Sequence, residues 1–295
     1  MANLTLKERF IGPRTPGRRP RRAAYALPTL FTAGNIFLGF LAILRSFQGA
    51  MWASAGHTGS NSFFEVAAAA IGVAVVLDGL DGRIARMTNT VSDFGRELDS
   101  LADVITFGIA PAVLAYAWGV QFLPVDPNNV IHRIGYFVSF LFLLCGAARL
   151  ARFNVQTNPI PKNPGRPDRK YFIGLPIPAA AGIVAAIVFA CDTVPLQWWV
   201  WSALWLALLA AISFLMVSTW RYPSFKDIHL TRPRSPLIII LFAAPILLIW
   251  MFPQQTLLAI AVSYVLTGIV IRAGGTIRRR FRHHPPPPQP EHQVG

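Results

Sequence analysis

The sequence predicts an all-α fold, a polytopic integral membrane helix bundle of about eight transmembrane helices with both termini cytoplasmic. Three observations predict it. Of the 295 residues, 54% are hydrophobic and only 14% are charged, which is too apolar for an ordinary soluble domain. The apolar residues gather in runs of membrane-span length. The basic residues fall in alternate connections between these runs, as in proteins that cross a bilayer several times.

Eight apolar runs follow a polar and basic N-terminal segment. Each has roughly the 17–25 residues that a helix needs to cross the hydrocarbon core. An even number of spans places both ends of the chain on the same side of the membrane. The runs cover about residues 27–48, 63–87, 94–118, 133–153, 174–191, 196–219, 235–251 and 255–272.

The charges of the connecting loops indicate how these runs are oriented. The connections 154–173 and 220–234 each contain four Lys or Arg residues. Because basic loops remain on the cytoplasmic side, these two loops, both termini and the turn near Arg86 are expected there. The connections that contain neither Lys nor Arg, and are expected outside, are 50–62, 119–132, 192–195 and 252–254.

Composition divides the chain into four parts. Residues 1–24 form a basic arm that is expected to be flexible, and residues 25–230 form the membrane core. Residues 231–273 add further transmembrane helices, and residues 274–295 form a basic, Pro-rich tail that is expected to be disordered. The formal net charge of +14 lies mainly in tails and loops, so the bilayer is the expected partner and nucleic acid is not.

Four aspartates lie near the ends of two neighbouring runs. Asp78 and Asp81 share a face of one helix, and Asp99 and Asp103 are one turn apart on the next. A single such acid is often an N-cap or a surface charge. Four together at the edge of a membrane repel one another unless a cation binds them. Oxygen ligands favour hard ions, so the pattern predicts a site for Mg²⁺ or Mn²⁺.

Small residues follow the same helix faces as the acids. Gly82, Ala85 and Gly95 leave room there for a bulky ligand, and they also let helix backbones approach. Arg86 stands beside them as an expected phosphate ligand.

The acids and the small residues together form the pattern D-x2-D-G-x2-A-R-x8-G-x3-D-x3-D. It begins at Asp78 and ends at Asp103 without a departure. This pattern resembles the signature of the CDP-alcohol phosphotransferase family. The resemblance implies a membrane enzyme with two divalent metal ions that transfers a phosphatidyl-type group from a CDP-linked donor to an alcohol and releases CMP.

The resemblance also assigns roles to individual residues. It implies that Asp78, Asp81, Asp99 and Asp103 bind metal, and that Asp103 serves as general base. Ser92 joins Arg86 as an expected contact of the donor's phosphates. A homodimer is a further expectation that rests on the resemblance alone.

Three outer stretches resemble the members of that family that use serine as acceptor. They are LPTLFTAGNIFLGF, RLARFN and YFIGLPIPAAAG. The implied substrates are CDP-diacylglycerol and L-serine. Glycerol 3-phosphate or an inositol phosphate remains an alternative acceptor. A transporter is a less favoured alternative, because the acids lie at helix ends rather than at mid-membrane.

Two of these stretches contain candidate binding residues. Thr32 and Asn35 lie three residues apart near the cytoplasmic start of the first run, where they either bind the CDP-lipid or join helices by hydrogen bonds. Arg149 and Arg152, followed by Asn154, lie at the cytoplasmic end of another run. They either anchor the helix at the membrane surface or bind the acceptor's carboxylate through the planar guanidinium fork.

The expected topology can be measured directly. In a chain whose own Cys145 and Cys191 are replaced, a cysteine at position 56 should react with an impermeant thiol reagent from outside. A cysteine at position 165 should react only after the membrane is opened, because its loop is basic. Reversed accessibility would contradict the orientation and place the aspartates on the wrong side for cytoplasmic nucleotides.

Overall fold

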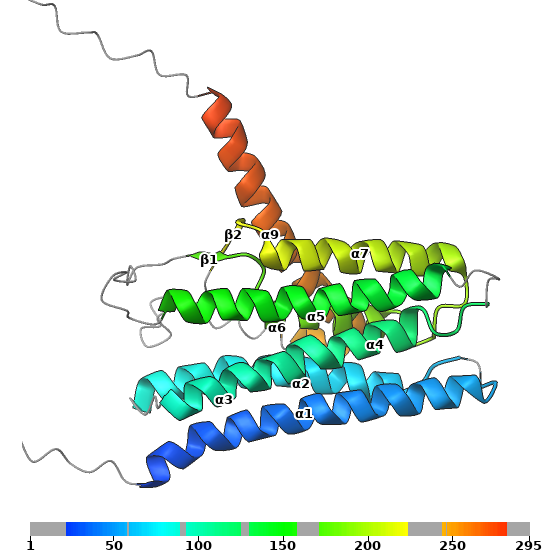
Figure 1. Ribbon diagram of the computed structural model, residues 1–295, viewed down its shortest axis with the longest axis horizontal. Helices are drawn as coiled ribbons and strands as arrows, with labels where there is room; N and C mark the ends of the chain where they lie inside the picture. The colour runs from blue at the N-terminus through cyan, green and yellow to red at the C-terminus, as the bar shows by residue number, and fades with distance from the viewer. Residues whose placement is uncertain are drawn as a thin grey trace, which may run out of the picture.

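The computed structural model describes residues 22–57, 59–88, 93–124, 130–157, 171–223, 244–245 and 247–281. These residues are almost entirely helical. The long helices between residues 22 and 217 lie side by side along one direction, whereas the helix that ends at Phe281 runs obliquely to them and extends away from the bundle (Figure 1). The predicted helical class is therefore confirmed. Most of the predicted N-terminal arm and much of the predicted tail lie outside the described residues.

The elements follow one another as long helices joined by short connections. α9 runs to Phe281, so it includes the first part of the stretch 274–295 that was expected to be a tail. Arginine, which recurs in this stretch, is a good helix former. The elements are α1 (Arg22–Ser54), α2 (Ser62–Thr88), α3 (Asp93–Asp103), the π-helix η2 (Val104–Ile109), α4 (Ala110–Gly119), α5 (Val130–Thr157), β1 (Tyr171–Ile173), α6 (Ile177–Ala190), α7 (Trp199–Val217), β2 (Arg221–Pro223) and α9 (Pro253–Phe281).

Six helical segments within the described ranges are long and apolar enough to cross a membrane. Each corresponds to one of the predicted runs, as expected for a multi-pass membrane protein. The predicted run 235–251 lies largely outside the described residues, so the expected total of eight remains a prediction. The six segments are Thr29–Ser54, Ser62–Asp81, Phe94–Gly119, Val130–Val155, Trp199–Val217 and Pro253–Arg272.

α6 differs from the run 174–191 that was expected to span the membrane. It begins only at Ile177 and contains 14 residues. Gly174 has a left-handed backbone (φ 78°) and Pro176 occupies the N-cap position, so the chain cannot be helical before that point. At 1.5 Å per residue the helix is about 21 Å long, less than the roughly 30 Å of a bilayer core. Most of its residues are buried, which makes it a central packing element.

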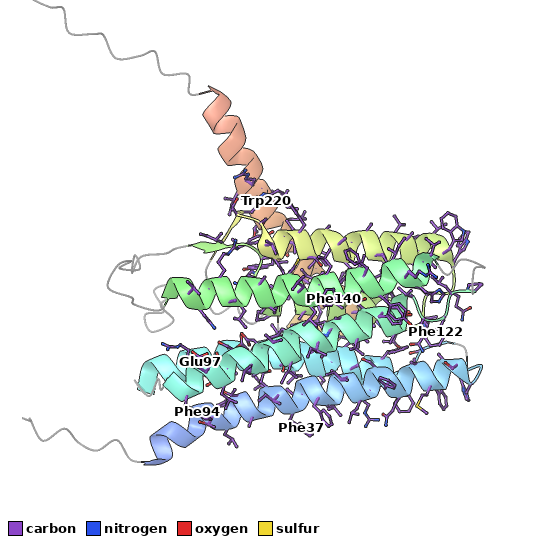
Figure 2. All side chains as sticks on the ribbon, in the orientation of Figure 1. Phe37, Phe94, Glu97, Phe122, Phe140 and Trp220 are labelled. Atoms are coloured by element: carbon purple, nitrogen blue, oxygen red, sulfur yellow. The ribbon has the colours of Figure 1, made fainter. Side chains whose placement is uncertain are left out.

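The side chains are arranged as expected for a bundle in lipid. Large apolar residues face outward; Phe37 on α1, for example, is 63% exposed and points away from the neighbouring helices (Figure 2). The buried core contains many alanines, including Ala67, Ala74, Ala110 and Ala180. Small core residues let helices approach closely, which is how helices associate where water provides no hydrophobic drive.

The closest approach of α1 to η2 is made by a glycine. A methyl group on Gly39 would lie 2.6 Å from Thr106 Oγ1 and 2.8 Å from Thr106 Cα. Asn35 lies one turn before Gly39 on α1, and its carbonyl oxygen accepts a hydrogen bond of 2.9 Å from Thr106 Oγ1. This contact holds α1 against the segment that follows Asp103.

A small sheet joins α6 and α7 where the sequence indicated only loops. β1 and β2 pair antiparallel, with Phe172 opposite Tyr222. The amide of Gly174 donates to the carbonyl oxygen of Trp220 (2.8 Å). This two-stranded sheet lies at the end of the bundle where α2 ends and α3 begins (Figure 1).

The α1–η2 contact predicts that alanine destabilises the protein at one glycine and not at another. Gly39→Ala should destabilise the protein by about 1–3 kcal/mol, because its methyl group would overlap the Thr106 backbone. Gly72→Ala on α2 is the matched control, since its methyl group has open space, and it should be neutral or mildly stabilising. Thermal unfolding in detergent measures both, and equal melting temperatures would contradict the contact.

Candidate active site

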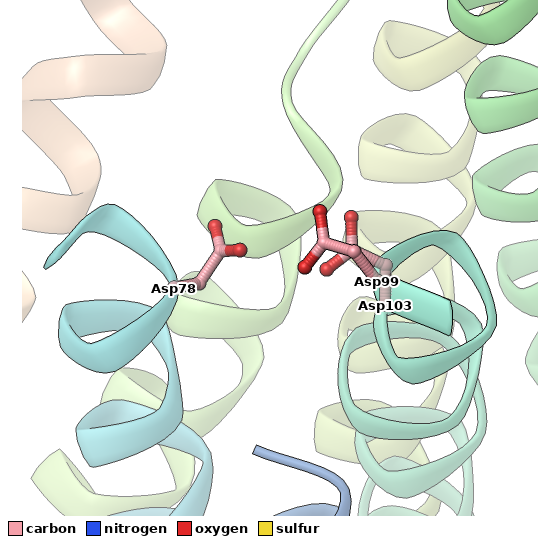
Figure 3. A group of neighbouring side chains, drawn as sticks. All are labelled: Asp78, Asp99 and Asp103. Carbon is pink, nitrogen blue, oxygen red and sulfur yellow. The ribbon is translucent and has the colours of Figure 1, made fainter. Parts of the chain in front are cut away.

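Three carboxylates from two helices meet at one end of the bundle. Asp78 comes from α2, and Asp99 and Asp103 come from α3. Each offers an oxygen atom within 4.8 Å of an oxygen atom of the other two. Figure 3 shows the three side chains pointing toward one another across the space between the helices. The helical spacing explains this, because Asp99 and Asp103 are one turn apart, on the face of α3 that points toward Asp78.

Asp81 lies beside this group and has a different partner. Its side chain is 8% exposed, and its Oδ2 accepts a hydrogen bond of 3.2 Å from Thr32 Oγ1 on α1. It is still close enough for its charge to act on Asp78 and Asp99. The structure therefore places the predicted fourth ligand at the edge of the group, where it also joins α1 to α2.

The donor atoms of this site fit a divalent cation. Three partly buried carboxylates so close together repel strongly, and a bound cation relieves the repulsion. Oδ1 of Asp81 and Oδ1 of Asp103 are buried and have no hydrogen-bond partner among the described residues. Buried acceptors without donors are rare in folded proteins and often indicate a missing ligand. An all-oxygen set of this kind is typical of Mg²⁺, Mn²⁺ or Ca²⁺ sites.

Arg149 provides the cationic side of the site. It lies on α5, is 8% exposed, and is close enough to Asp103 for their opposite charges to attract. Its Nε is buried without a hydrogen-bond partner in the described part of the chain. A buried guanidinium with a free donor beside a cluster of acids is suited to bind an anionic ligand.

The other two candidate acceptor residues also lie at this end of α5. Arg152 Nη1 donates to the carbonyl oxygen of Val217 at the end of α7 (3.2 Å), while its buried Nη2 has no partner among the described atoms. Asn154 Nδ2 donates to Ser100 Oγ (2.8 Å). Asn154 therefore connects α5 to α3 beside the acids. Its expected role in binding the acceptor remains a prediction.

The expected donor-binding residues are only partly brought together. Asn35 is 3% exposed, with its Oδ1 buried and unpaired among the described residues, and Thr32 bonds to Asp81. Gly95 lies one turn before Asp99 on α3. Gly82, Ala85 and Arg86 lie in α2, but their surroundings are outside the described part of the structure. Ser92 itself lies outside the described residues.

Sequence reasoning missed a pair of tyrosines, Tyr222 on β2 and Tyr264 on α9. Tyr264 on α9 interacts electrostatically with Arg149, and the ring of Tyr222 on β2 lies 5.8 Å from that of Tyr264. A tyrosine within an otherwise apolar span is the only sign that the sequence offers. Burial raises the pKa of Tyr222, which lies outside the membrane-spanning segments, so its hydroxyl remains protonated at neutral pH.

Comparison with known proteins agrees with this geometry. The family model for CDP-alcohol phosphatidyltransferase matches residues 25–212. A CDP-diacylglycerol–serine O-phosphatidyltransferase of Helicobacter pylori (strain ATCC 700392 / 26695) is 37% identical over 252 residues, which cover 85% of this chain and 92% of that protein. The protein of the same name from Bacillus subtilis (strain 168) is 33% identical over 68% of this chain and 91% of its own length. An archaetidylserine synthase of Methanothermobacter thermautotrophicus is 35% identical over 67% of this chain and 70% of its own length.

The fold and the acid cluster thus define a membrane-embedded site that can hold a divalent cation. The chain belongs to the CDP-alcohol phosphatidyltransferase family. The family resemblance expected from the aspartate pattern is confirmed.

The acid cluster predicts cation binding that can be measured without turnover. Purified protein should bind Mn²⁺, detected by loss of the free-ion electron paramagnetic resonance signal. Asp99→Asn should weaken this binding at least 10-fold, because it removes one charged ligand from a shared site. Glu97→Gln is the matched control, since Glu97 lies on α3 but is exposed and outside the group. Equal affinities in the two variants would contradict the site.

Proposed function

We propose that this protein transfers the phosphatidyl group of CDP-diacylglycerol to L-serine, producing phosphatidylserine and CMP in phospholipid biosynthesis. One observation carries the proposal: a group of three carboxylates lies next to the buried Arg149 at one end of a membrane bundle. The aspartates complete the signature of the family, and relatives covered over most of their length are named for serine.

In this proposal, Asp78, Asp99 and Asp103 hold Mg²⁺ or Mn²⁺, with Asp81 contributing from the edge. The family resemblance favours two ions. When bound, such ions neutralise the pyrophosphate charge and stabilise the phosphate of CMP as it leaves. The protein's part is to hold the four acids in place, for which the hydrogen bond from Thr32 to Asp81 supplies one constraint.

The donor would lie with its acyl chains in the bilayer and its nucleotide at the acid cluster. The resemblance assigns Gly82, Ala85 and Gly95 to the space for the nucleotide, and Arg86 and Ser92 to its phosphates. The unpaired Oδ1 of the buried Asn35 is an acceptor suited to an N–H or O–H group of the ligand. Because Thr32 bonds to Asp81, it supports the site indirectly, by joining helices.

The acceptor would approach from the side of Arg149 and Arg152. Either guanidinium can bind the carboxylate of serine, and Arg149 is the better placed, since its charge acts directly on Asp103. Asp103 then takes the proton from the serine hydroxyl through its unpaired Oδ1. The serine oxygen forms a bond to the phosphorus next to diacylglycerol, and the bond from that phosphorus to CMP breaks. We place this site on the cytoplasmic side, in agreement with the basic loops.

A reaction assay tests the function. Purified protein with CDP-diacylglycerol and L-serine should release CMP and form phosphatidylserine, should lose activity in excess EDTA, and should recover with Mg²⁺ or Mn²⁺. Serine should be the best of a panel that includes ethanolamine, glycerol 3-phosphate and inositol phosphate. Better use of another alcohol would contradict the acceptor, and full activity in EDTA would contradict the metal.

The role of Arg149 can be tested in the same assay. Arg149→Ala should raise the serine KM roughly 10- to 150-fold, the value of a charge-assisted bidentate contact, with a much smaller effect on the KM for CDP-diacylglycerol. Arg149→Lys should recover part of the loss, because it restores the charge without the planar fork. Arg45→Ala is the control, since Arg45 bonds to Gln48 in the second half of α1, which leads to the connection expected outside. An unchanged serine KM in folded Arg149→Ala protein would exclude this assignment.

A further inference from the structure

The last turns of α5 lie between the acid-bearing helix α3 and the end of α7. α5 ends at Thr157, and Arg149, Arg152 and Asn154 follow one another along its final turns. Figure 1 shows this end of α5 at the same end of the bundle as α3. Two side-chain hydrogen bonds join these turns to their neighbours, one to α3 and one to α7.

The bond to α3 is made by Asn154. Its Nδ2 donates to Ser100 Oγ at 2.8 Å, and Ser100 Oγ donates in turn to the carbonyl oxygen of Arg96, one turn earlier on α3 (3.0 Å). A hydroxyl has a single hydrogen to donate. Because this hydrogen serves Arg96, Ser100 accepts from the amide, and the orientation of the Asn154 side chain is fixed by that bond.

Ser100 lies within the part of α3 that carries the acids. Asp99 precedes it directly, and Asp103 follows one turn later. All three residues belong to one hydrogen-bonded helix, so a shift of Ser100 relative to α5 shifts both carboxylates. The bond from Asn154 therefore sets the acids of α3 against the end of α5.

The other side of the same turns is joined to α7. Arg152 Nη1 donates to the carbonyl oxygen of Val217, the last residue of α7 (3.2 Å). The last carbonyl groups of a helix lack partners within it, and a cation there also interacts favourably with the helix dipole. The turn at Gly174 packs on the same guanidinium, since a methyl group on Gly174 would lie 3.3 Å from Arg152 Nη2. The end of α5 is thus held from two sides close to Arg149.

Transfer of the phosphatidyl group needs α3 and α5 in register. In the proposed function, the acids hold the donor through the metal, and Arg149 on α5 holds the carboxylate of the acceptor. Reacting atoms must lie about 3–3.5 Å apart and in line, and a misplacement of about 1 Å can lower a rate roughly 100-fold. A bond between α3 and α5 can therefore control the rate of transfer without touching either substrate.

We propose that Asn154 is a positioning residue, which acts through Ser100 to set α3 and its two acids against the arginine side of α5. The inference rests on the proposed function, in which the acids serve the donor and Arg149 serves the acceptor. Direct contact with the acceptor, which the sequence suggested for Asn154, predicts different kinetics, because loss of a substrate contact acts on KM.

Steady-state kinetics of purified variants separate the two roles. Asn154→Ala should lower kcat roughly 10- to 100-fold through misalignment. The KM for serine and the KM for CDP-diacylglycerol should each change by less than about 2-fold, because neither binding side is altered. A raised serine KM with an unchanged kcat would show direct contact with the acceptor and overturn the inference.

The partner residue gives an independent pair of variants. Ser100→Ala should lower kcat as Asn154→Ala does. Ser100→Thr should keep kcat, since Ser100 is only half-buried and a threonine hydroxyl can make the same bond to the Arg96 carbonyl while it accepts from Asn154. Equal kcat values in Ser100→Ala and the unmodified protein would overturn the inference.

Gln254→Ala is the matched control. Gln254 Nε2 donates to Asp192 Oδ1 at 2.7 Å, so this variant also removes an amide hydrogen bond between distant segments. Gln254 lies at the start of α9, in the connection expected outside, and its loss should leave kcat unchanged. Thermal unfolding in detergent is measured for every variant. A lower melting temperature of Asn154→Ala with an unchanged kcat would make its bond merely structural and overturn the inference.

A double-mutant cycle tests whether Asn154 acts through Ser100. Both residues contribute to one hydrogen bond, so Asn154→Ala combined with Ser100→Ala should have about the same kcat as either single variant, because coupled residues are not additive. Losses that multiply in the double variant would mean that the two residues act independently, which contradicts the proposed route.

A distance measurement tests the positioning without any substrate. Phe94 on α3 and Ala151 on α5 are exposed, and Figure 2 shows Phe94 at the surface. Nitroxide labels at Phe94→Cys and Ala151→Cys, in a chain whose Cys145 and Cys191 are replaced, report the separation of the two helices by electron paramagnetic resonance. The distance distribution should broaden or shift when Asn154→Ala is added and stay the same when Gln254→Ala is added. An identical distribution in all three proteins would overturn the inference.

The unmodified protein separates this inference from the proposed function. If it releases CMP faster with another alcohol than with serine, the proposed function fails. The label distances do not depend on the acceptor, and kcat is then compared with that alcohol, so the same outcomes still decide the role of Asn154.

Discussion

The repulsion among carboxylates at the edge of a membrane is the constraint on which this structure depends. Asp78, Asp99 and Asp103 place oxygen atoms within 4.8 Å of one another. Two unit charges about 4 Å apart interact by roughly 4 kcal/mol at the effective dielectric of a protein surface. A fold that brings three together needs contacts that hold the helices against this force, and a cation that removes it. The hydrogen bonds from Thr106 to the Asn35 carbonyl and from Asn154 to Ser100 are contacts of the first kind.

Small residues and a wide helical turn make the arrangement possible. Gly39 lets α1 approach Thr106, and the π-helix η2 begins directly after Asp103. A π-helical turn contains more residues than an α-helical turn, so the face that bears the acids on α3 does not continue along α4. Beyond that point the chain turns Ala110, Leu114 and Trp118 into the core. One continuous span thus presents acids at its end and an apolar surface over the rest of its length.

The chemistry of the site is divided between two sides. The acids come from α2 and α3, within the stretch shared with the family. The arginines come from α5, which packs mainly against α7, and Arg152 donates a hydrogen bond to the carbonyl oxygen of Val217 at the end of that helix. In the proposed function, the acids serve the metal-assisted transfer from the CDP-linked lipid, and the arginines serve the choice of alcohol.

Length, hydropathy and spacing were sufficient to predict most of the helices, and the resemblance of the aspartate pattern to a family signature predicted the family. Helical periodicity alone places Asp99 and Asp103 on one face, and six apolar runs became long helices as predicted. These properties are local, so the sequence by itself determined them. It also indicated that Arg149 and Arg152 lie at one helix end, but it left open whether they bind a ligand or only anchor the helix.

Contacts between distant segments were decided only by the tertiary structure. Asp81 accepts a hydrogen bond from Thr32, 49 residues away, while Asp78 lies with Asp99 and Asp103. Helical spacing alone does not distinguish Asp78 from Asp81, because both lie on one face of the helix. α6 begins later than its apolar run, because Gly174 and Pro176 prevent helix formation at the start of that run. Tyr222 and Tyr264 lie beside each other only because α9 packs against β2. Such pairings depend on how helices pack in three dimensions, and no periodicity within one segment encodes them.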